Sequence, residues 1–263
     1  DYPEGQPTFA AQSDLWASVR FIGMYDARVN TEFGKTYLGV APDSNLEMPL
    51  ETIGYLTFLS DYHPPLGSFT LLLLALACIF QLEKVRNGLW QQRLLIGILV
   101  ATGPLMLITN TWVVPLQALL VFGWLIYRKL NGRTLCYQSV IIGGLLPLFL
   151  SYPFLFEFTS QALSTPVKWV GAGQHVDFLQ WLLVLWPLLL LWLLAAFVVK
   201  RFPLLAFAMV MSGLFLGLAE CVIIDDPMGG EWDRFNTSLK WWSWTQVFML
   251  VTLAGALFAV KIK

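Results

Sequence analysis

The sequence is poor in charge and in cysteine. Only 13% of its 263 residues are charged, whereas soluble domains carry about 25%. The net charge of -1 lacks the basic excess that binding to a phosphate backbone requires, so we expect no nucleic-acid partner. The three cysteines, Cys78, Cys136 and Cys221, show no CxxC spacing. This argues against a disulfide framework and against a structural zinc site.

Apolar residues make up 57% of the chain, and they come in long runs. A bilayer core of about 30 Å needs ~20 apolar residues per helix, with ~17 as the lower limit. The runs that reach this length are 66–83, 93–109, 112–128, 136–156, 178–199, 203–222 and 241–260. We therefore predict an all-α, polytopic bundle of about seven transmembrane helices. Its domains would be an exterior N-terminal segment, 1–65, and a transmembrane domain, 66–263.

The distribution of Lys and Arg predicts the orientation of this bundle. If 1–65 lies on one side, that side receives six of the 16 basic residues, and the short loops and the C-terminus on the other side receive ten. Because cytoplasmic loops are enriched in Lys and Arg, we expect the N-terminal segment outside and the C-terminus in the cytoplasm. The basic loops themselves look like orientation signals. The chain begins without Met, so we expect a processed form, a split subunit or a part of a longer protein.

The stretch from Ser60 to Pro65 precedes the first predicted helix and carries Asp61 and His63. An acid and an imidazole two residues apart are suited to acid–base chemistry or to metal binding. Alternatively, Asp61 caps the helix and the prolines set its first turn. Spacing alone leaves both interpretations open.

Asn110 lies at the tip of the predicted hairpin between the second and third helices. It could present hydrogen bonds to a ligand, or it could belong to a polar turn beside an interfacial Trp. Trp241, Trp242 and Trp244 begin the last predicted helix. We expect these three to form an aromatic belt at the membrane interface.

The densest polar cluster runs from Glu220 to Lys240. Glu220 ends an apolar helix, and acids at such positions are candidates for function. Arg234 and Lys240 near several carboxylates suit a phosphate or pyrophosphate group, with a divalent cation as a further candidate ligand. The alternative is an exterior loop whose charges pair with one another in water.

Together, these segments resemble the prokaryotic YYY membrane proteins, a family of unknown function that is grouped with the GT-C glycosyltransferases. The stretches that carry the resemblance are Trp16–Arg20 (W-x-S-x-R), Glu51–Pro65, Thr109–Pro115 (T-N-T-W), Tyr152–Gln161 and Glu220–Lys240. The chain departs from the family pattern at Pro65, Val113, Ile223 and Leu239. Family members also carry further helices upstream, so the chain resembles their C-terminal part. The resemblance therefore implies a partner or preceding segment that supplies those helices.

The resemblance implies a GT-C-like, membrane-embedded glycosyltransferase that uses a lipid-phosphate-linked sugar at the exterior interface of a prokaryotic plasma membrane. The roles it implies are base for Asp61 or His63, phosphate or sugar binding for Arg20, Asn110, Arg234, Asn236 and Lys240, and ordering of these cations or binding of a divalent ion for Glu220 and Asp226. The rival hypothesis is a non-catalytic accessory subunit of a larger membrane complex. A transporter is less favoured, because the predicted helices carry almost no charge near their centres.

Overall fold

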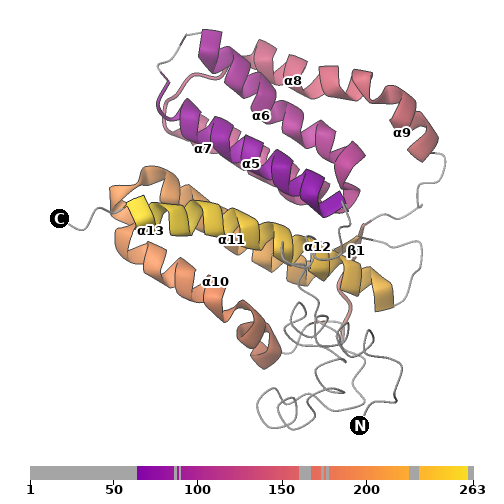
Figure 1. Cartoon of the computed structure of the whole chain (residues 1–263), viewed down its shortest axis with the longest axis vertical. Coiled ribbons are helices and arrows are strands. Elements are labelled where there is room, and N and C mark those ends of the chain that lie inside the picture. The colour runs from indigo at the N-terminus through magenta and orange to yellow at the C-terminus, as the bar shows by residue number, and fades with distance from the viewer. Residues whose placement is uncertain are drawn as a thin grey trace, which may run out of the picture.

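The computed structural model describes residues 64–85, 88, 90–159, 167–172, 175, 178–224 and 231–259. The described part is mostly helical (Figure 1). Its elements are α5 (Pro64–Leu82), α6 (Trp90–Thr109), η2 (Thr111–Val113), α7 (Val114–Leu130), α8 (Tyr137–Leu150), α9 (Tyr152–Thr159), β1 (Val167–Trp169), α10 (Phe178–Val198), η3 (Val199–Arg201), α11 (Pro203–Cys221), β2 (Val222–Ile224), α12 (Glu231–Met249), a π-helical turn η4 (Leu250–Ala254) and α13 (Gly255–Ala259).

Five helices in the described ranges are long and apolar enough to cross a membrane. They are Pro65–Leu82, Trp90–Thr109, Thr111–Leu130, Pro203–Cys221 and Thr237–Ala259. They coincide with five of the predicted runs, as expected of an integral membrane protein. A further predicted run, 178–199, forms the 21-residue helix α10, and some of its side chains lie outside the described residues.

The predicted span 136–156 is not one continuous helix. It divides at Ser151 into α8, which has 14 residues, and α9, which has eight. Pro153 lies in the first turn of α9. Because proline has no N–H to donate to the carbonyl four residues earlier and its ring clashes with that carbonyl, it disfavours one continuous helix through this point. At 1.5 Å per residue, 14 residues cover about 21 Å, which is shorter than a bilayer core.

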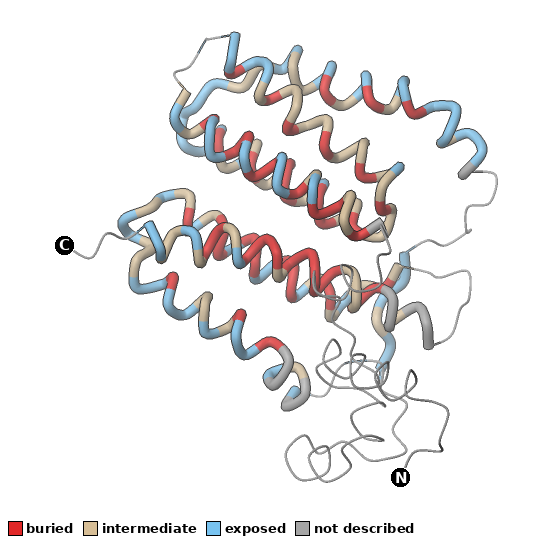
Figure 2. The backbone as a smooth tube through the Cα atoms, viewed as in Figure 1, coloured by how far each residue is buried: buried red, intermediate tan, exposed pale blue. Residues whose placement is uncertain are grey.

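The helices form two groups that pack against each other (Figure 1). The first contains α5 to α8, and the second contains α10 to α13. Between the groups, α5 contacts α12 and α7 contacts α11. Figure 2 shows the buried residues on the faces that these helices turn toward one another, whereas α8 and α9 are exposed along much of their length.

Aromatic side chains fill the core of the second group. The ring of Phe215 lies edge-on to those of Trp244 and Phe248, with centroid distances of 5.1 and 5.2 Å. Trp241, Trp242 and Trp244 are each no more than 1% exposed. The prediction of an interfacial belt is therefore wrong for these three tryptophans, because belt residues must face the lipid headgroups.

Two glycines bring α6 and α8 into close backbone contact. A Cβ atom built on Gly143 of α8 would overlap the backbone carbonyl of Gly97 on α6. Small residues at such a crossing allow two membrane helices to pack backbone to backbone. This close approach explains how α8, which is largely exposed, stays attached to α6.

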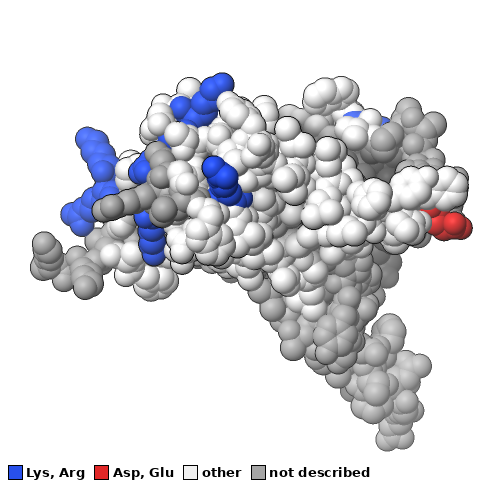
Figure 3. All heavy atoms as spheres, turned by 90° about the horizontal axis from the view of Figure 1, so that it is seen from above, with Lys and Arg blue, Asp and Glu red and all other residues white. Residues whose placement is uncertain are grey.

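Basic side chains gather at one end of the bundle (Figure 3). This basic end comprises the connections at the ends of α5 and α7 and the turn η3. Its described members are Lys84, Arg93, Arg128, Lys129, Arg133, Lys200 and Arg201. The opposite end, called the Glu220 end below, contains the start of α5, the turn η2, the strands β1 and β2, and the start of α12.

One of these basic residues has a structural role that the loop pattern did not predict. Arg128 is fully buried. Its Nη1 donates to the carbonyl of Leu82 at 3.2 Å and its Nε to that of Thr134 at 3.1 Å. It therefore ties the last turn of α5 to the loop after α7, and it is more than an orientation signal.

Candidate functional site

Four segments that are distant in sequence meet at the Glu220 end. They are the start of α5, the turn η2 between α6 and α7, the end of α11 with β2, and the start of α12. This end holds the sequence-predicted residues that the structure describes: Asn110, Glu220, Arg234 and Lys240. Arg20, Asp61, His63 and Asp226 lie outside the described residues. Asn236 lies in α12, but its side chain is not described.

Glu220 and Arg234 form an ion pair across the end of α11 and the start of α12. Glu220 Oε1 and Arg234 Nη2 are 2.8 Å apart, with side chains only 21% and 13% exposed. Arg234 Nη1 also donates to the backbone carbonyl of Ala219. The guanidinium therefore binds both the carboxylate and a carbonyl of the last helical turn, where a positive charge is favoured by the helix dipole.

The ion pair does not use all the hydrogen-bonding groups of its two side chains. Nη2 of Arg234 and Oε1 of Glu220 lie 2.8 Å apart without forming an aligned hydrogen bond, and Nε of Arg234 is buried without a partner among the described residues. A buried guanidinium N–H group without an acceptor is costly unless another acceptor binds it. Phosphate and carboxylate oxygens are the acceptors that best match a guanidinium. The geometry thus leaves Arg234 with binding capacity beyond Glu220.

A short antiparallel sheet holds the chain that follows Glu220. β2 pairs with β1 in the register Val167–Ile224, Lys168–Ile223 and Trp169–Val222. On its other side, the amide of Ile224 donates to Thr237 Oγ1 of α12 at 3.0 Å. Ile223 is 2% exposed. The backbone after α11 is therefore fixed from both sides, which positions the carboxylate that precedes it.

Asn110 is buried in the turn between α6 and α7. It is 3% exposed, and its Nδ2 lies 3.4 Å from Ser68 Oγ of α5. Its Oδ1 is buried without a hydrogen bond in the described part of the chain. Asn110 therefore joins the start of α5 to the turn and still has one acceptor oxygen to use.

Lys240 and Trp241 of α12 both contact Trp112. The ammonium of Lys240 lies 4.5 Å from the centroid of the Trp112 ring, which is the geometry of a cation–π interaction. Trp241 Nε1 donates to the carbonyl of Trp112 at 2.7 Å. Lys240 is thus oriented by Trp112, two residues after Asn110.

One stripe of α12 makes the connections between these segments. Arg234, Thr237 and Trp241 are spaced i, i+3 and i+7, so they share a helix face. Arg234 binds the end of α11, Thr237 binds β2, and Trp241 binds η2. Sequence reasoning did not assign a role to Thr237 or Trp241 in the site. The helical spacing of polar residues after Arg234 was the available signal.

The predicted metal site has no further support. Among the described residues, no group of three or more His, Cys, Asp or Glu side chains is placed to hold a metal ion. Asp226, the predicted partner of Glu220, lies outside those residues. Glu220 instead takes Arg234 as its counter-ion. A divalent cation therefore stays a prediction.

Comparison of the chain with protein-family models, with curated proteins and with solved structures gives no match. The resemblance to YYY membrane proteins and to GT-C glycosyltransferases therefore stays a prediction from the sequence. What the structure adds is the arrangement at the Glu220 end. An arginine with spare donors, a lysine on an aromatic ring and an amide with a spare acceptor lie on neighbouring elements there. Such a set can bind an anionic group that also carries hydroxyls.

Proposed function

We propose that this chain is a membrane-embedded, glycosyltransferase-like protein that binds a lipid-phosphate-linked sugar at the Glu220 end. The observation that carries the proposal is the half-buried Arg234, which is paired with Glu220 but keeps N–H donors without an aligned acceptor. A phosphate oxygen satisfies those donors. A lipid-linked substrate fits because the site lies at the end of a bundle with apolar, membrane-length helices.

The remaining residues are assigned roles from their chemistry and, where they are described, from their positions. Lys240 supplies a second cation for the phosphate, and Trp112 orients it. Asn110 offers its free oxygen to a sugar hydroxyl. Asp61 and His63 come just before Pro64, where α5 begins at this end, and we assign the base to one of them. Leaving-group charge is then stabilised by fixed cations, and the acceptor hydroxyl is deprotonated by the base.

The first test measures binding. The purified protein in lipid nanodiscs is offered a fluorescent polyprenyl-phosphate sugar, with the neutral polyprenol as competitor. We expect Arg234→Gln to weaken binding about 10- to 100-fold, because a hydrogen bond to a charged group contributes about 1.5–3 kcal/mol. Lys240→Gln should weaken it less, and Lys129→Gln at the basic end should change nothing. Equal binding by Arg234→Gln and the wild type contradicts the proposal.

The second test separates chemistry from binding and folding. Asp61→Asn should retain binding but lose turnover with a hydroxyl acceptor, if Asp61 is the base; His63→Gln is the parallel variant. Glu220→Gln keeps the shape of the carboxylate, so its thermal stability reports whether the buried pair is needed for folding. Turnover by both base variants at the wild-type rate contradicts the assignment of either residue as the base.

The rival function, an accessory subunit, is favoured by one observation. Arg234, Thr237 and Trp241 all bind other parts of the same chain, as they do when their role is structural. Purification in a mild detergent distinguishes the two functions. A stoichiometric protein partner together with no affinity for the polyprenyl-phosphate sugar supports the accessory role.

A further inference from the structure

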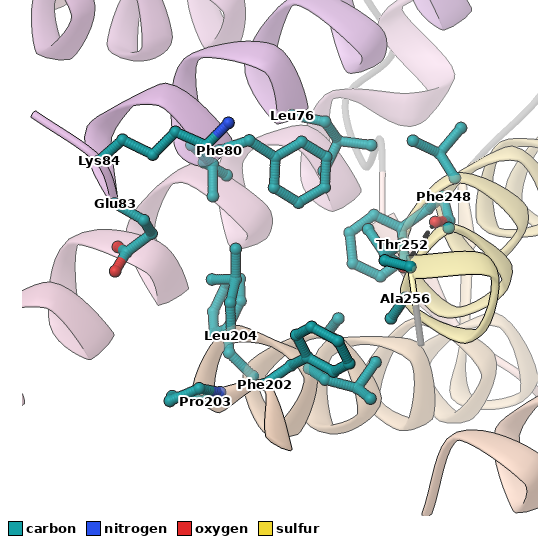
Figure 4. Close-up of a pocket in the computed structure, with 17 residues that line it drawn as sticks. Leu76, Phe80, Glu83, Lys84, Phe202, Pro203, Leu204, Phe248, Thr252 and Ala256 are labelled. Carbon is teal, nitrogen blue, oxygen red and sulfur yellow. Dashed lines mark hydrogen bonds between the residues drawn. The ribbon is translucent and has the colours of Figure 1, made fainter. Parts of the chain in front are cut away.

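A cavity of about 570 Å³ lies between the two helix groups, toward the basic end. Its walls come from the last turns of α5, the first turns of α11, and the segment from the end of α12 to α13. In Figure 4, Leu76 and Phe80 lie on one side, Leu204 and Phe202 on another, and Phe248 and Ala256 on a third. Its size falls within the range of about 300–1,000 Å³ for small-molecule sites. The lining is almost entirely apolar, so the interior suits a hydrocarbon chain.

The third wall contains a break in regular helix geometry. Leu250–Ala254 form a π-helical turn between α12 and α13, and Thr252 within it donates to the carbonyl of Phe248 at 2.7 Å. Such turns are rare and occur frequently at functional sites. Gly255 follows directly, and a Cβ atom built on it meets no atom within 4 Å. The cavity therefore has space at Gly255 that the side chain of a larger residue would fill.

The rim of the cavity carries charge. Lys84 lies along it beside Phe80, whereas the carboxylate of Glu83 points away from the cavity centre (Figure 4). The turn η3, which includes Lys200 and Arg201, leads directly into Phe202 of the lining. Of these three basic residues, Lys84 lines the cavity, and Lys200 and Arg201 belong to the turn that precedes the lining residue Phe202. An apolar interior below a basic rim matches the shape of an anionic lipid, whose charged headgroup is attached to hydrocarbon chains.

We propose that this cavity binds an anionic membrane phospholipid, with one acyl chain between α5, α11 and α13 and the phosphate at Lys84 and η3. Charge complementarity identifies the occupant, because a neutral lipid gains nothing from the basic rim. The site is at the opposite end of the bundle from Arg234. It therefore stands independently of the function proposed for the Glu220 end.

Photocrosslinking tests the acyl-chain position. The protein is placed in phosphatidylcholine nanodiscs that contain a small fraction of phosphatidylglycerol with a photoreactive diazirine in one acyl chain. We expect crosslinked peptides from the ends of α5 and α13 and the start of α11. Gly255→Leu places a side chain in the cavity and should lower this labelling at least fivefold. Gly213→Leu is the matched control, because a Cβ there also meets nothing within 4 Å and Gly213 does not line the cavity.

The same probe tests the headgroup preference. A phosphatidylcholine version with the same diazirine should label these peptides much less than the phosphatidylglycerol version. Lys84→Gln should lower the preference about fivefold, since one basic residue near an anionic surface contributes about 1 kcal/mol. Lys129→Gln should leave it unchanged. Equal labelling by the two lipids, or equal labelling of Gly255→Leu and Gly213→Leu, overturns the proposal.

Discussion

Trp241 donates its indole N–H to the backbone carbonyl of Trp112, with a nitrogen–oxygen distance of 2.7 Å. The two residues are 129 positions apart, and their hydrogen bond joins the second helix group to the first. The preceding residue, Lys240, lies over the ring of the same Trp112. Two consecutive residues of α12 therefore hold one residue of η2, which fixes the turn that contains Asn110.

Replacing Trp241 by Phe should lower the stability of the bundle. The variant keeps an aromatic ring but leaves the carbonyl of Trp112 without its donor, which costs about 1–2 kcal/mol. Trp242→Phe is the matched control, because Trp242 is equally buried and its Nε1 has no hydrogen-bond partner in the described part of the chain. Thermal unfolding in detergent should show a larger loss for Trp241→Phe. Equal losses would show that ring size alone matters.

Gly143→Ala should separate α8 from α6. The added methyl would overlap the backbone of Gly97, and a backbone carbonyl cannot move aside as a flexible side chain does. Overpacking of this kind costs about 1–3 kcal/mol. At the next position, a Cβ on Gly144 would lie 3.9 Å from Val100, so Gly144→Ala should be tolerated. Proteolysis in detergent, read by cleavage in the connections to α8, should increase only for the first variant.

Arg128→Lys should destabilise the basic end even though it keeps the charge. A lysine cannot reproduce the two hydrogen bonds to the carbonyls of Leu82 and Thr134 from fixed directions. We expect a loss of about 2–4 kcal/mol in unfolding free energy. Lys129 is exposed, so Lys129→Gln should change stability by less than about 0.5 kcal/mol. A tolerated Arg128→Lys would show that the charge, and not the planar fork, holds the loop.

Cys136 should react with alkylating agents at lower pH than an ordinary thiol. It lies in the loop before α8, where a hydrogen bond from Ser139 stabilises the thiolate and lowers the pKa of the Cys136 thiol below its usual value. Since the thiolate is the nucleophile, the alkylation rate should rise with pH through a midpoint below that usual value. Ser139→Ala should move the midpoint upward.

The alkylation experiment is cleanest in a background with Cys78→Ser and Cys221→Ser, which leaves Cys136 as the one thiol. The rate is followed by mass spectrometry from pH 5 to pH 10. An unchanged midpoint in Ser139→Ala would contradict the role of this hydrogen bond.

Run length predicted where the membrane-length helices lie but not which faces they bury. A helix that is apolar on every side carries no pattern that separates a lipid-facing side from a core-facing side. Trp241, Trp242 and Trp244 stand at the start of an apolar run, which predicts an interfacial position, whereas the structure buries them. The same limit applies to α8, where run length did not predict the interruption at Ser151.

The candidate site was also predicted only in part from the sequence. The sequence indicated Glu220, Arg234 and Lys240, because charges beside apolar runs stand out. It did not indicate the strand pair, since three-residue strands are too short for an alternating pattern. The pairing of β1 with β2 also depends on a contact between segments more than fifty residues apart, and nothing local encodes it.

The small sheet also limits how deep the bundle lies in a bilayer. β1 is exposed along its length, and hydrocarbon cannot satisfy the edge N–H and C=O groups of an exposed strand, so we expect the sheet to remain in the headgroup layer or above it. α11 ends at Cys221, immediately before β2, and its 19 residues cover about 28 Å at 1.5 Å per residue. That length nearly equals the hydrocarbon thickness of about 30 Å. If α11 crosses the bilayer, we expect its two ends to mark the two faces of the membrane and the ion pair of Glu220 to lie at the water boundary.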